Sequence, residues 1–166
     1  MQPIEFRYLL LVGLAIALLI AATTDIRSRH IDNRLNAVIA ATAPLYWWAS
    51  GLAPWPGIAW QLGVAAITFV VCAGLFALRA MGGGDVKLLT ALALWIEPLQ
   101  FLRLVIGMAL IGGVLTVVVG AWHIARRRRD RLAIPYGVAI SSAGLWVLFT
   151  QFSPVIQSFG RTGGAG

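Results

Sequence analysis

The residues best suited to chemistry in this chain are its few carboxylic acids. The sequence holds six, and two of them, Asp25 and Asp85, lie at the ends of apolar segments: Asp25 follows the first, and Asp85 stands between the third and the fourth. A carboxylate at the edge of a membrane is costly unless it faces water or a partner, so such a residue often has a function. Two carboxylates in one site cannot both ionise easily, and one keeps its proton. Such a pair can hydrolyse a bond, because the ionised member activates water and the neutral member protonates a carbonyl oxygen.

Three consecutive glycines stand directly before Asp85, in the segment 81–85 (MGGGD). Glycine is a poor helix former, but it lets another backbone approach closely, as an extended peptide substrate must. A flexible turn between two helices is the simpler interpretation of these glycines. Asp25 could likewise cap a helix end or pair with an arginine that follows it, and Asp85 could pair with Lys87. Both interpretations of each acid stay open at this point.

Other catalytic or metal-binding side chains are scarce. The single cysteine, Cys72, rules out an internal disulfide and the multi-cysteine patterns of zinc and iron–sulfur sites. The two histidines, His30 and His123, offer little material for a metal site. No Gly-Lys-Ser/Thr follows the glycines, so a phosphate-binding loop is not expected. We therefore expect a reaction that uses neither a metal nor a cofactor.

The composition predicts where these acids lie. Of the 166 residues, 60% are hydrophobic and 11% are charged, and the mean hydropathy is +0.85. An ordinary soluble domain has about 25% charged residues, and a disordered chain has low hydrophobicity. A soluble single-domain enzyme and a disordered segment are both excluded. The sequence predicts an all-α, polytopic membrane protein.

The apolar segments divide into about six predicted transmembrane helices. Residues 35–78 form an uncharged stretch of 44 residues. As a continuous helix it would measure about 66 Å, enough for two crossings of a hydrocarbon core about 30 Å thick. The break is expected at 50–57, which is rich in Gly and Pro and surrounded by tryptophans. The predicted crossings are Tyr8–Thr24, Leu35–Ala49, Ile58–Leu78, Leu88–Ile96, Leu104–Ala125 and Tyr136–Phe152.

The basic residues predict the orientation of these crossings. The segment Leu88–Ile96 is short, but only if it also crosses do the basic loops share one face. That face then carries ten basic residues against three on the other, and the richer face is expected to be cytoplasmic. Both termini are therefore predicted to lie outside, with the fourth crossing short or the bilayer locally thinned. The arginine cluster 126–131 is expected to set topology and contact anionic lipid, and no nucleic-acid partner is expected.

Three segments carry a resemblance to a known family. Residues 82–89 (GGGDVKLL) resemble the Gly-x-Gly-Asp motif of intramembrane aspartyl proteases, in the form found in type IV prepilin peptidases. Residues 25–33 (DIRSRHIDN) resemble the first aspartate motif of that family, where a basic stretch and then Ile-Pro-Asn follow the acid. Residues 134–140 (IPYGVAI) are similar to the Pro-Tyr/Phe-Gly-x-Ala segment that opens its last helix. The three segments stand in the expected order over nearly the whole chain.

The resemblance implies roles for particular residues. Asp25 and Asp85 would be the catalytic pair, and Gly82 and Gly84 the motif glycines beside the second acid. Asp32 stands where the family usually has proline, and we expect it to be a helix N-cap without a catalytic role. Larger members of the family carry a cytoplasmic domain with two Cys-x-x-Cys pairs that accompanies methylation of the product. With one cysteine, this chain resembles the short form that serves Flp (tight-adherence) pili, so neither methyltransferase activity nor zinc is expected.

The resemblance also implies a domain plan and partners. One transmembrane peptidase domain is expected over residues 1–158, followed by a flexible tail over 159–166. The substrate would be a prepilin, with a basic leader and a hydrophobic helix, cut at the cytoplasmic face of the bacterial inner membrane. The lipid bilayer is the other expected partner, and the oligomeric state stays open. Two rival hypotheses are a small proton-coupled transporter that uses the acids as a relay, and a non-catalytic subunit of a pilus or secretion machine.

Overall fold

The chain folds into a bundle of helices. The computed structural model describes residues 3–125 and 136–162, with the side chains of 5–122 and 136–151. Within those residues the secondary structure is helical and contains no strand, which confirms the predicted all-α class. The elements are α1 (Pro3–Ser28), α2 (Asn33–Ala49), the short turn η1 (Pro54–Ile58), α3 (Ala59–Ala77), α4 (Gly83–Ala93), α5 (Pro98–Ala125) and α6 (Tyr136–Thr162).

Three of these helices are long and apolar enough to cross a membrane. They are the segments Glu5–Ser28, Pro54–Ala77 and Pro98–Trp122, which belong to α1, to η1 with α3, and to α5. Their outward-facing surface is apolar, since side chains such as Val70, Leu110 and Val117 are largely exposed. Exposed apolar surface of this extent suits lipid contact and does not suit water. The chain is a membrane protein, as its composition predicted.

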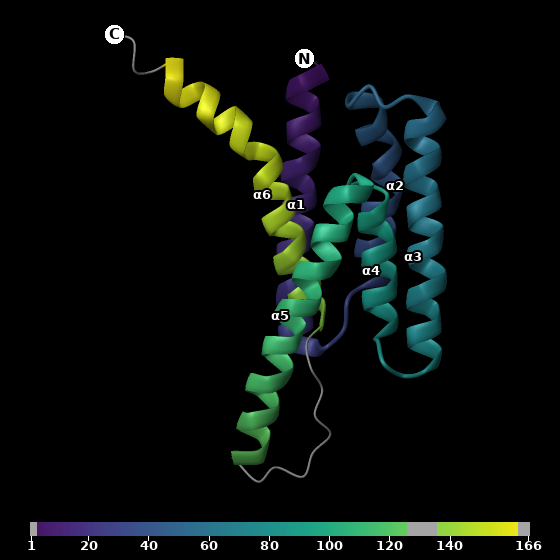
Figure 1. Cartoon of the computed structure of the whole chain (residues 1–166), viewed down its shortest axis with the longest axis vertical. Coiled ribbons are helices and arrows are strands. Elements are labelled where there is room, and N and C mark those ends of the chain that lie inside the picture. Colours follow the sequence, from purple (N-terminus) through teal and green to yellow (C-terminus); the bar gives the residue numbers. More distant parts are fainter. Residues whose placement is uncertain (1–2, 126–135, 163–166) are drawn as a thin grey trace.

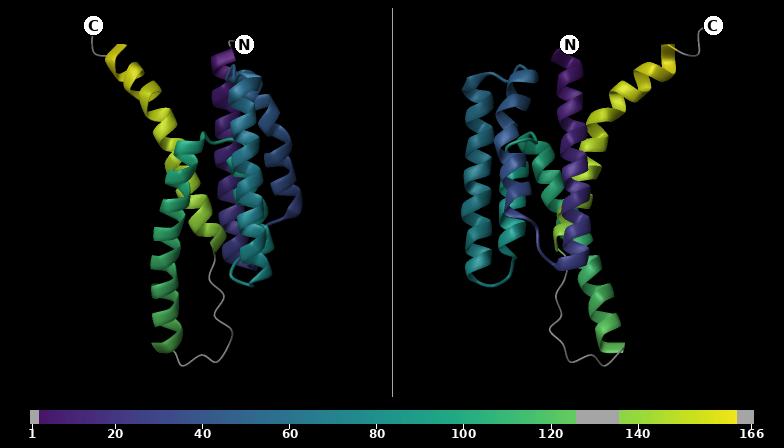
Figure 2. Two further views of the ribbon diagram at one scale, coloured as in Figure 1. Left: turned by 45° about the vertical axis from the view of Figure 1, so that its right-hand side comes forward. Right: turned by 180° about the vertical axis from the view of Figure 1, so that it is seen from behind.

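Successive helices run in alternating directions between two ends of the bundle (Figure 1). Helix α1 begins and α6 ends at the same end, which we call the terminal end. The opposite end carries Asp25, Asp85 and the connections 29–32 and 78–82, and we call it the aspartate end. Figure 2 shows the same alternation from two further sides, with α5 extending beyond the other helices at the aspartate end. The alternation agrees with six passes, although α4 stops well short of the terminal end.

The short helix α4 is the centre of the bundle. It packs against α2, α3, α5 and α6, and seven of its 11 residues are buried. Leu88, Leu92 and Ala93 have no exposed surface. An 11-residue helix measures about 16 Å, so α4 spans about half of a hydrocarbon core. The bundle therefore holds its carbonyl end at depth among the other helices.

Glycines allow the other helices to come close. On α6, a Cβ atom at Gly144 would lie 2.9 Å from Leu18 Cδ1 of α1, so only glycine fits there without a shift. On α5, a Cβ atom at Gly107 would lie 3.5 Å from Ala143 Cβ of α6, an ordinary contact. Small residues at such crossings bring helix backbones together, which is the usual way membrane helices pack.

Several predicted bounds need correction. Helix α1 is longer at both ends than Tyr8–Thr24, and α5 begins at Pro98 and not at Leu104. Hydropathy marks only the part of a helix that lies in lipid, so polar first and last turns escape it. Helix α6 begins at Tyr136 as predicted but extends to Thr162, into the expected tail 159–166. Residues 163–166 and the arginine cluster 126–131 lie outside the described residues.

The break between the second and third crossings lies where the sequence placed it. Helix α2 ends at Ala49, Gly51 adopts a positive φ of 64°, and the chain enters η1 at Pro54. Glycine takes that backbone conformation without the steric cost of a Cβ atom. The turn therefore follows from the local sequence alone.

Candidate functional site

Asp25 lies in the last turns of α1 and is buried, with 6% of its surface exposed. Its Oδ2 accepts a hydrogen bond of 3.2 Å from the backbone N–H of Val138, in the first turn of α6. The first N–H groups of a helix have no partner within the helix and form its positive end. The start of α6 therefore stabilises a negative charge on the Asp25 carboxylate.

Gly137 makes this contact possible. A Cβ atom at Gly137 would lie 2.8 Å from Asp25 Oδ2 and 2.9 Å from Ile31 Cδ1, closer than side-chain atoms pack. Only glycine lets the start of α6 come this near to the carboxylate. The resemblance drew attention to the segment 134–140, but the sequence alone did not place Gly137 or Val138 at Asp25.

Asp85 lies in the first turn of α4, with 9% of its surface exposed. Burial and, to a smaller extent, the negative charge of Asp25 raise the pKa of this carboxyl to about 6, while a backbone hydrogen bond at Gly82 opposes them. Asp85 therefore keeps its proton in a pH range where an exposed aspartate is ionised. The effect of Asp25 on Asp85 shows that the two carboxyls share one site, although they come from α1 and α4.

The three glycines before Asp85 are part of a packed helix start, which corrects the expectation of a poor helix or flexible turn. Gly82 is the N-cap of α4, and Gly83 and Gly84 lie in its first turn. A Cβ atom at Gly82 would lie 2.9 Å from Asp85 Oδ2, and one at Gly83 would lie 3.3 Å from Phe76 Cε2. The space on the Cβ side of these glycines is thus occupied by atoms of this chain. The close approach of a substrate backbone to them stays a prediction.

Ile31 joins the supports of the two acids. Its side chain is 2% exposed and lies in the connection between α1 and α2. A Cβ atom at Gly84 would lie 3.2 Å from Ile31 Cβ, and the Ile31 Cδ1 atom reaches Gly137. Ile31 therefore fills the space between the start of α4, which carries Asp85, and the start of α6, which holds Asp25. Ile31 stands at the isoleucine of the Ile-Pro-Asn stretch in the first aspartate motif, but nothing in the sequence alone assigned a role to its side chain.

Polar contacts tie the start of α2 to the start of α4. The buried Asn36 donates from Nδ2 to the carbonyl oxygen of Gly84 at 3.3 Å. Lys87 donates from Nζ to Asn33 Oδ1 at 2.8 Å, so its ammonium pairs with α2 and not with Asp85 as the simpler interpretation had it. These two hydrogen bonds thus hold the first turn of α4 against the start of α2.

Asp32 has the structural role that the sequence predicted. It is the N-cap of α2, and its Oδ1 accepts a hydrogen bond of 2.9 Å from the backbone N–H of Arg34. Its side chain is exposed. Among the residues that the structure describes, no three His, Cys, Asp or Glu side chains gather into a group that could hold a metal ion.

A comparison with models of protein families shows the family of this chain. The model of the type IV leader peptidase family (Peptidase_A24) matches residues 12–117, which is more than half of the chain. The chain belongs to the type IV leader peptidase family. The range that matches this peptidase family contains both Asp25 and Asp85 but ends before the start of α6. Comparisons with curated proteins and with solved structures found no match.

Membership of this leader peptidase family defines the general activity. The chain is a membrane peptidase, and a peptidase hydrolyses peptide bonds. Hydrolysis needs one group that activates water and one that protonates the carbonyl oxygen or the leaving nitrogen. Two buried carboxyls in different electrostatic surroundings are suited to these two tasks.

Proposed function

We propose that the chain is an aspartic endopeptidase that removes the leader peptide of type IV or Flp-type prepilins at the cytoplasmic face of the inner membrane. Asp25 and Asp85 are its catalytic pair, with Gly82 and Gly84 as the glycines beside the second acid. One observation carries this proposal. Two buried carboxyls from α1 and α4 share a site at one end of the bundle, where the charge of Asp25 raises the pKa of Asp85.

The surroundings of each carboxyl suggest its role. The Asp25 carboxylate accepts a hydrogen bond from the backbone N–H of Val138, and we assign to Asp25 the role of the base. Burial and the charge of Asp25 raise the pKa of Asp85 to about 6, which favours Asp85 as the acid. Asp25 takes a proton from water, the water oxygen bonds to the scissile carbonyl carbon, and Asp85 gives its proton to the carbonyl oxygen. Asp25 then passes its proton to the leaving nitrogen as the C–N bond breaks, and Asp85 recovers a proton from a hydroxyl of the tetrahedral intermediate.

The charge distribution supports the proposed membrane face. Five basic residues of the described chain lie near the aspartate end, and three lie near the terminal end. The five are Arg27, Arg29, Arg34, Arg79 and Lys87, and the three are Arg7, Arg103 and Arg161. The richer face of a membrane protein is usually cytoplasmic. A prepilin leader is basic and stays in the cytoplasm, so its junction with the hydrophobic helix lies at this face. The lipid bilayer and the prepilin are the proposed partners, and no nucleic acid, metal or cofactor is involved.

A single activity is part of the proposal. The chain contains one cysteine, whereas the methylating members that it resembles carry two Cys-x-x-Cys pairs. We infer that the product is cleaved and not methylated. We therefore propose that the chain belongs with the short, Flp-type peptidases.

Variants of the acids test the proposal. Asp25→Asn and Asp85→Asn should each lower the rate of leader removal by about 10²- to 10⁴-fold, the usual contribution of a general acid or base. The assay follows cleavage of a prepilin in vesicles that contain the purified protein. Asp32→Asn is the matched control, since Asp32 is a third acid at the same end, is exposed and caps a helix. Full processing by the Asp25 or the Asp85 variant would exclude the assignment.

The same variants separate the rival hypotheses. A non-catalytic subunit of a secretion machine would tolerate both substitutions in a processing assay. A proton-coupled transporter would need acids deep within the spans. Asp25 and Asp85 instead lie in terminal turns of their helices at one end of the bundle, which favours the peptidase.

A further inference from the structure

A polar cavity of about 560 Å³ lies on the far side of the bundle from the two aspartates, beyond the carbonyl end of α4. It exists because α4 has only 11 residues and the chain turns back into α5 at Glu97 and Pro98. Neighbouring helices extend past that turn (Figure 1), and residues of α1, α3 and α6 line the cavity beside it. Polar side chains from several helices and from the residues next to them line the cavity. They are Arg7 of α1, Ser50 after α2, Gln61 of α3, Glu97 before α5, Gln100 of α5 and Gln151 of α6.

Most of the buried, unpartnered polar atoms of the described chain belong to residues that line this cavity. Six buried side-chain nitrogen or oxygen atoms of the described chain have no hydrogen-bond partner, and four belong to cavity residues, namely Arg7 Nε, Ser50 Oγ, Gln61 Oε1 and Gln151 Oε1. Buried polar atoms in native proteins are almost always paired, because removal from water without a partner is costly. Their concentration in one cavity indicates a polar ligand with several hydrogen-bonding groups.

Gln61 defines one part of that ligand. Its side chain is 4% exposed, and its Nε2 donates to the carbonyl oxygen of Leu94 at 3.3 Å. The amide orientation is therefore set, and Oε1 can only accept a hydrogen bond. The same carbonyl oxygen already accepts from Trp47 Nε1 at 2.7 Å. This end of α4 is the negative end of the helix, and Glu97 adds a negative charge beside it. The surroundings of Gln61 suit a cation that carries N–H donors.

Arg7 defines the other part. Its guanidinium is a permanent cation that lines the same cavity, and its Nε has no partner there. A planar guanidinium pairs well with phosphate, because several N–H groups point in fixed directions. The cavity thus offers one cationic donor group for an anion and a group of acceptors for an ammonium.

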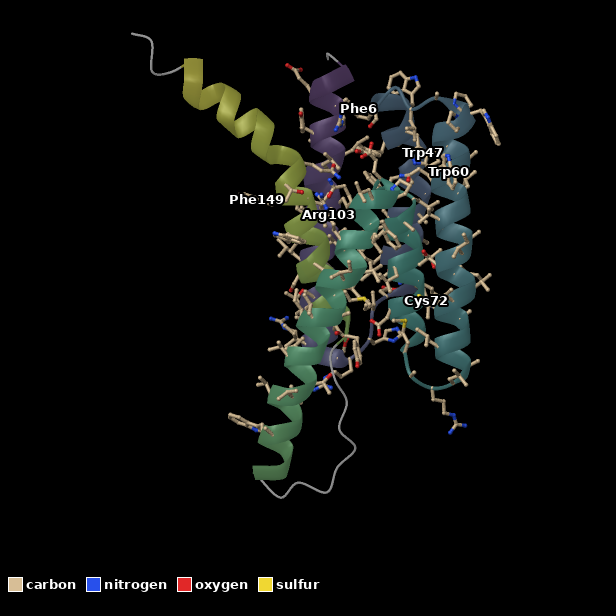
Figure 3. The ribbon with its side chains drawn as sticks, viewed as in Figure 1. Phe6, Trp47, Trp60, Cys72, Arg103 and Phe149 are labelled. Atoms are coloured by element: carbon tan, nitrogen blue, oxygen red, sulfur yellow. The ribbon has the colours of Figure 1, made fainter. Side chains whose placement is uncertain are left out.

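The rim of the cavity faces lipid. Trp60 and Leu99 line it and are 65% and 63% exposed on the membrane-facing surface. Figure 3 shows Trp47 and Trp60 towards the terminal end of the bundle, with Cys72 nearer the aspartate end. Tryptophan gathers where the headgroups of a bilayer begin. The cavity therefore opens at headgroup level, where a lipid reaches it from the side.

We propose that this cavity binds the headgroup of a phospholipid that carries a phosphodiester and a primary ammonium. The phosphodiester pairs with Arg7, and the ammonium donates hydrogen bonds to Gln61 and to the acceptors around it. The acyl chains leave the cavity past Trp60 and Leu99. The bound headgroup brings the outer surface of the bilayer down to the end of α4, which explains how such a short helix is accommodated. The site is separate from the aspartate pair, so either proposal can fail without the other.

Native mass spectrometry of the full chain, purified in detergent, tests the proposal by comparing three lipids with identical acyl chains. Phosphatidylethanolamine should be retained at least about tenfold better than phosphatidylcholine, because a choline group has no N–H donor and bonds to charged groups are strong. Phosphatidylglycerol should be retained as poorly as phosphatidylcholine, because it has no cation. Equal retention of the three lipids would overturn the proposal.

Variants locate the binding. Arg7→Gln and Gln61→Met should each reduce phosphatidylethanolamine retention to the level of phosphatidylcholine, while Arg79→Gln should leave it unchanged. Arg79 is the matched control, since it is an exposed arginine that follows α3 at the aspartate end and does not line the cavity. Circular dichroism checks that each variant remains helical. Retention that is insensitive to both cavity variants would place the lipid elsewhere and overturn the proposal.

A soluble headgroup distinguishes the source of the ligand. Glycerophosphoethanolamine has the same polar chemistry but no acyl chain, and it should not displace the lipid at equal concentration. Displacement would show that the cavity takes a free phosphodiester from the water outside and would overturn its assignment to a lipid.

Discussion

The backbone N–H of Val138 donates a hydrogen bond of 3.2 Å to the Asp25 carboxylate, although the two residues lie 113 positions apart in the chain. This bond joins the last turns of α1 to the first turn of α6. It places the positive end of one helix against an acid that ends another. The site is therefore assembled by three helix ends, those of α1, α4 and α6, and not by one motif.

Enlarging Gly137 should disturb this contact. In Gly137→Ala, the new Cβ atom would lie within 2.8 Å of Asp25 Oδ2, so the carboxylate or the start of α6 must shift. A shift of about 1 Å in a catalytic group can lower the rate about 10²-fold. We expect a loss of that order in leader cleavage, measured in vesicles with purified protein.

Gly113→Ala is the control for this substitution. A Cβ atom at Gly113 meets nothing within 4 Å, and both glycines lie in helices. Alanine favours helix by about 1 kcal/mol over glycine, so neither variant should unfold for backbone reasons. Equal activity of the two variants would contradict the role of Gly137.

Shortening Ile31 should loosen the spacing of the two acids. Ile31→Ala removes the side chain that fills the space between Gly84 and Gly137. A buried isoleucine truncated to alanine loses about 2–5 kcal/mol of stability, and here the two helix starts also lose their spacer. We expect lower kcat with little change in KM, because the acids and not the substrate contacts are disturbed.

Ile39→Ala is the matched control, since Ile31 and Ile39 are equally buried at 2% exposed surface. Ile39 lies on α2, and its carbonyl oxygen accepts from Trp95 Nε1, away from the acids. The two variants should lose similar thermal stability, but only Ile31→Ala should lower kcat. An equal loss of kcat in both variants would show that Ile31 contributes to stability like any other core residue and does not position the acids.

The pKa of Asp85 predicts the pH dependence of the reaction. Burial and the charge of Asp25 raise this pKa from 3.8 to about 6, so the folded protein holds a proton there that an unfolded chain releases. Protonation of Asp85 therefore contributes stability that declines as pH rises from about 4 to about 6. If Asp85 is the acid, activity should also decline as pH rises through its pKa.

Infrared spectroscopy can measure this titration through the carbonyl stretch of the protonated carboxyl. The band of Asp85 should disappear with a midpoint near pH 6. Asp25→Asn removes one of the causes of the raised pKa, so the midpoint should move to lower pH. A midpoint that stays unchanged in this variant would show that the two carboxyls do not share a site.

Substitutions of Asp32 should affect stability and not catalysis. Asp32→Ala removes the acceptor for the backbone N–H of Arg34, and loss of an N-cap costs about 1 kcal/mol. We expect a lower melting temperature with processing retained, whereas Asp32→Asn should keep both, because asparagine also caps helices well. Loss of processing in Asp32→Asn would mean that the negative charge of this third acid matters.

Much of the fold could be predicted from local properties. The uncharged runs indicated the helices, and the cluster of Gly and Pro at 50–57 marked the turn before η1. Asp32 was predicted as an N-cap from its residue type and position, and the structure confirms it. These features depend on neighbours a few positions away, so a linear pattern contains them.

The start of α4 shows where such reasoning is insufficient. Gly82, Gly83 and Gly84 looked like a flexible turn, because glycine lowers helix propensity. A Cβ atom added at each of them would instead lie too close to Asp85, Phe76 and Ile31 respectively. Tertiary packing selects glycine there for lack of a side chain, and no local propensity contains that information.

The sequence by itself determined that this chain lies in a membrane, which two acids are candidates for chemistry, and that both stand at one end of their helices. Only the tertiary structure decided what holds them. Val138 and Gly137 from α6 adjoin Asp25, and Ile31 lies between the start of α4 and the start of α6. The reason is physical. The apolar or charged type of each residue can be read from the sequence, but the hydrogen bond at Asp25 and the raised pKa of Asp85 arise from atoms that meet only after the helices pack.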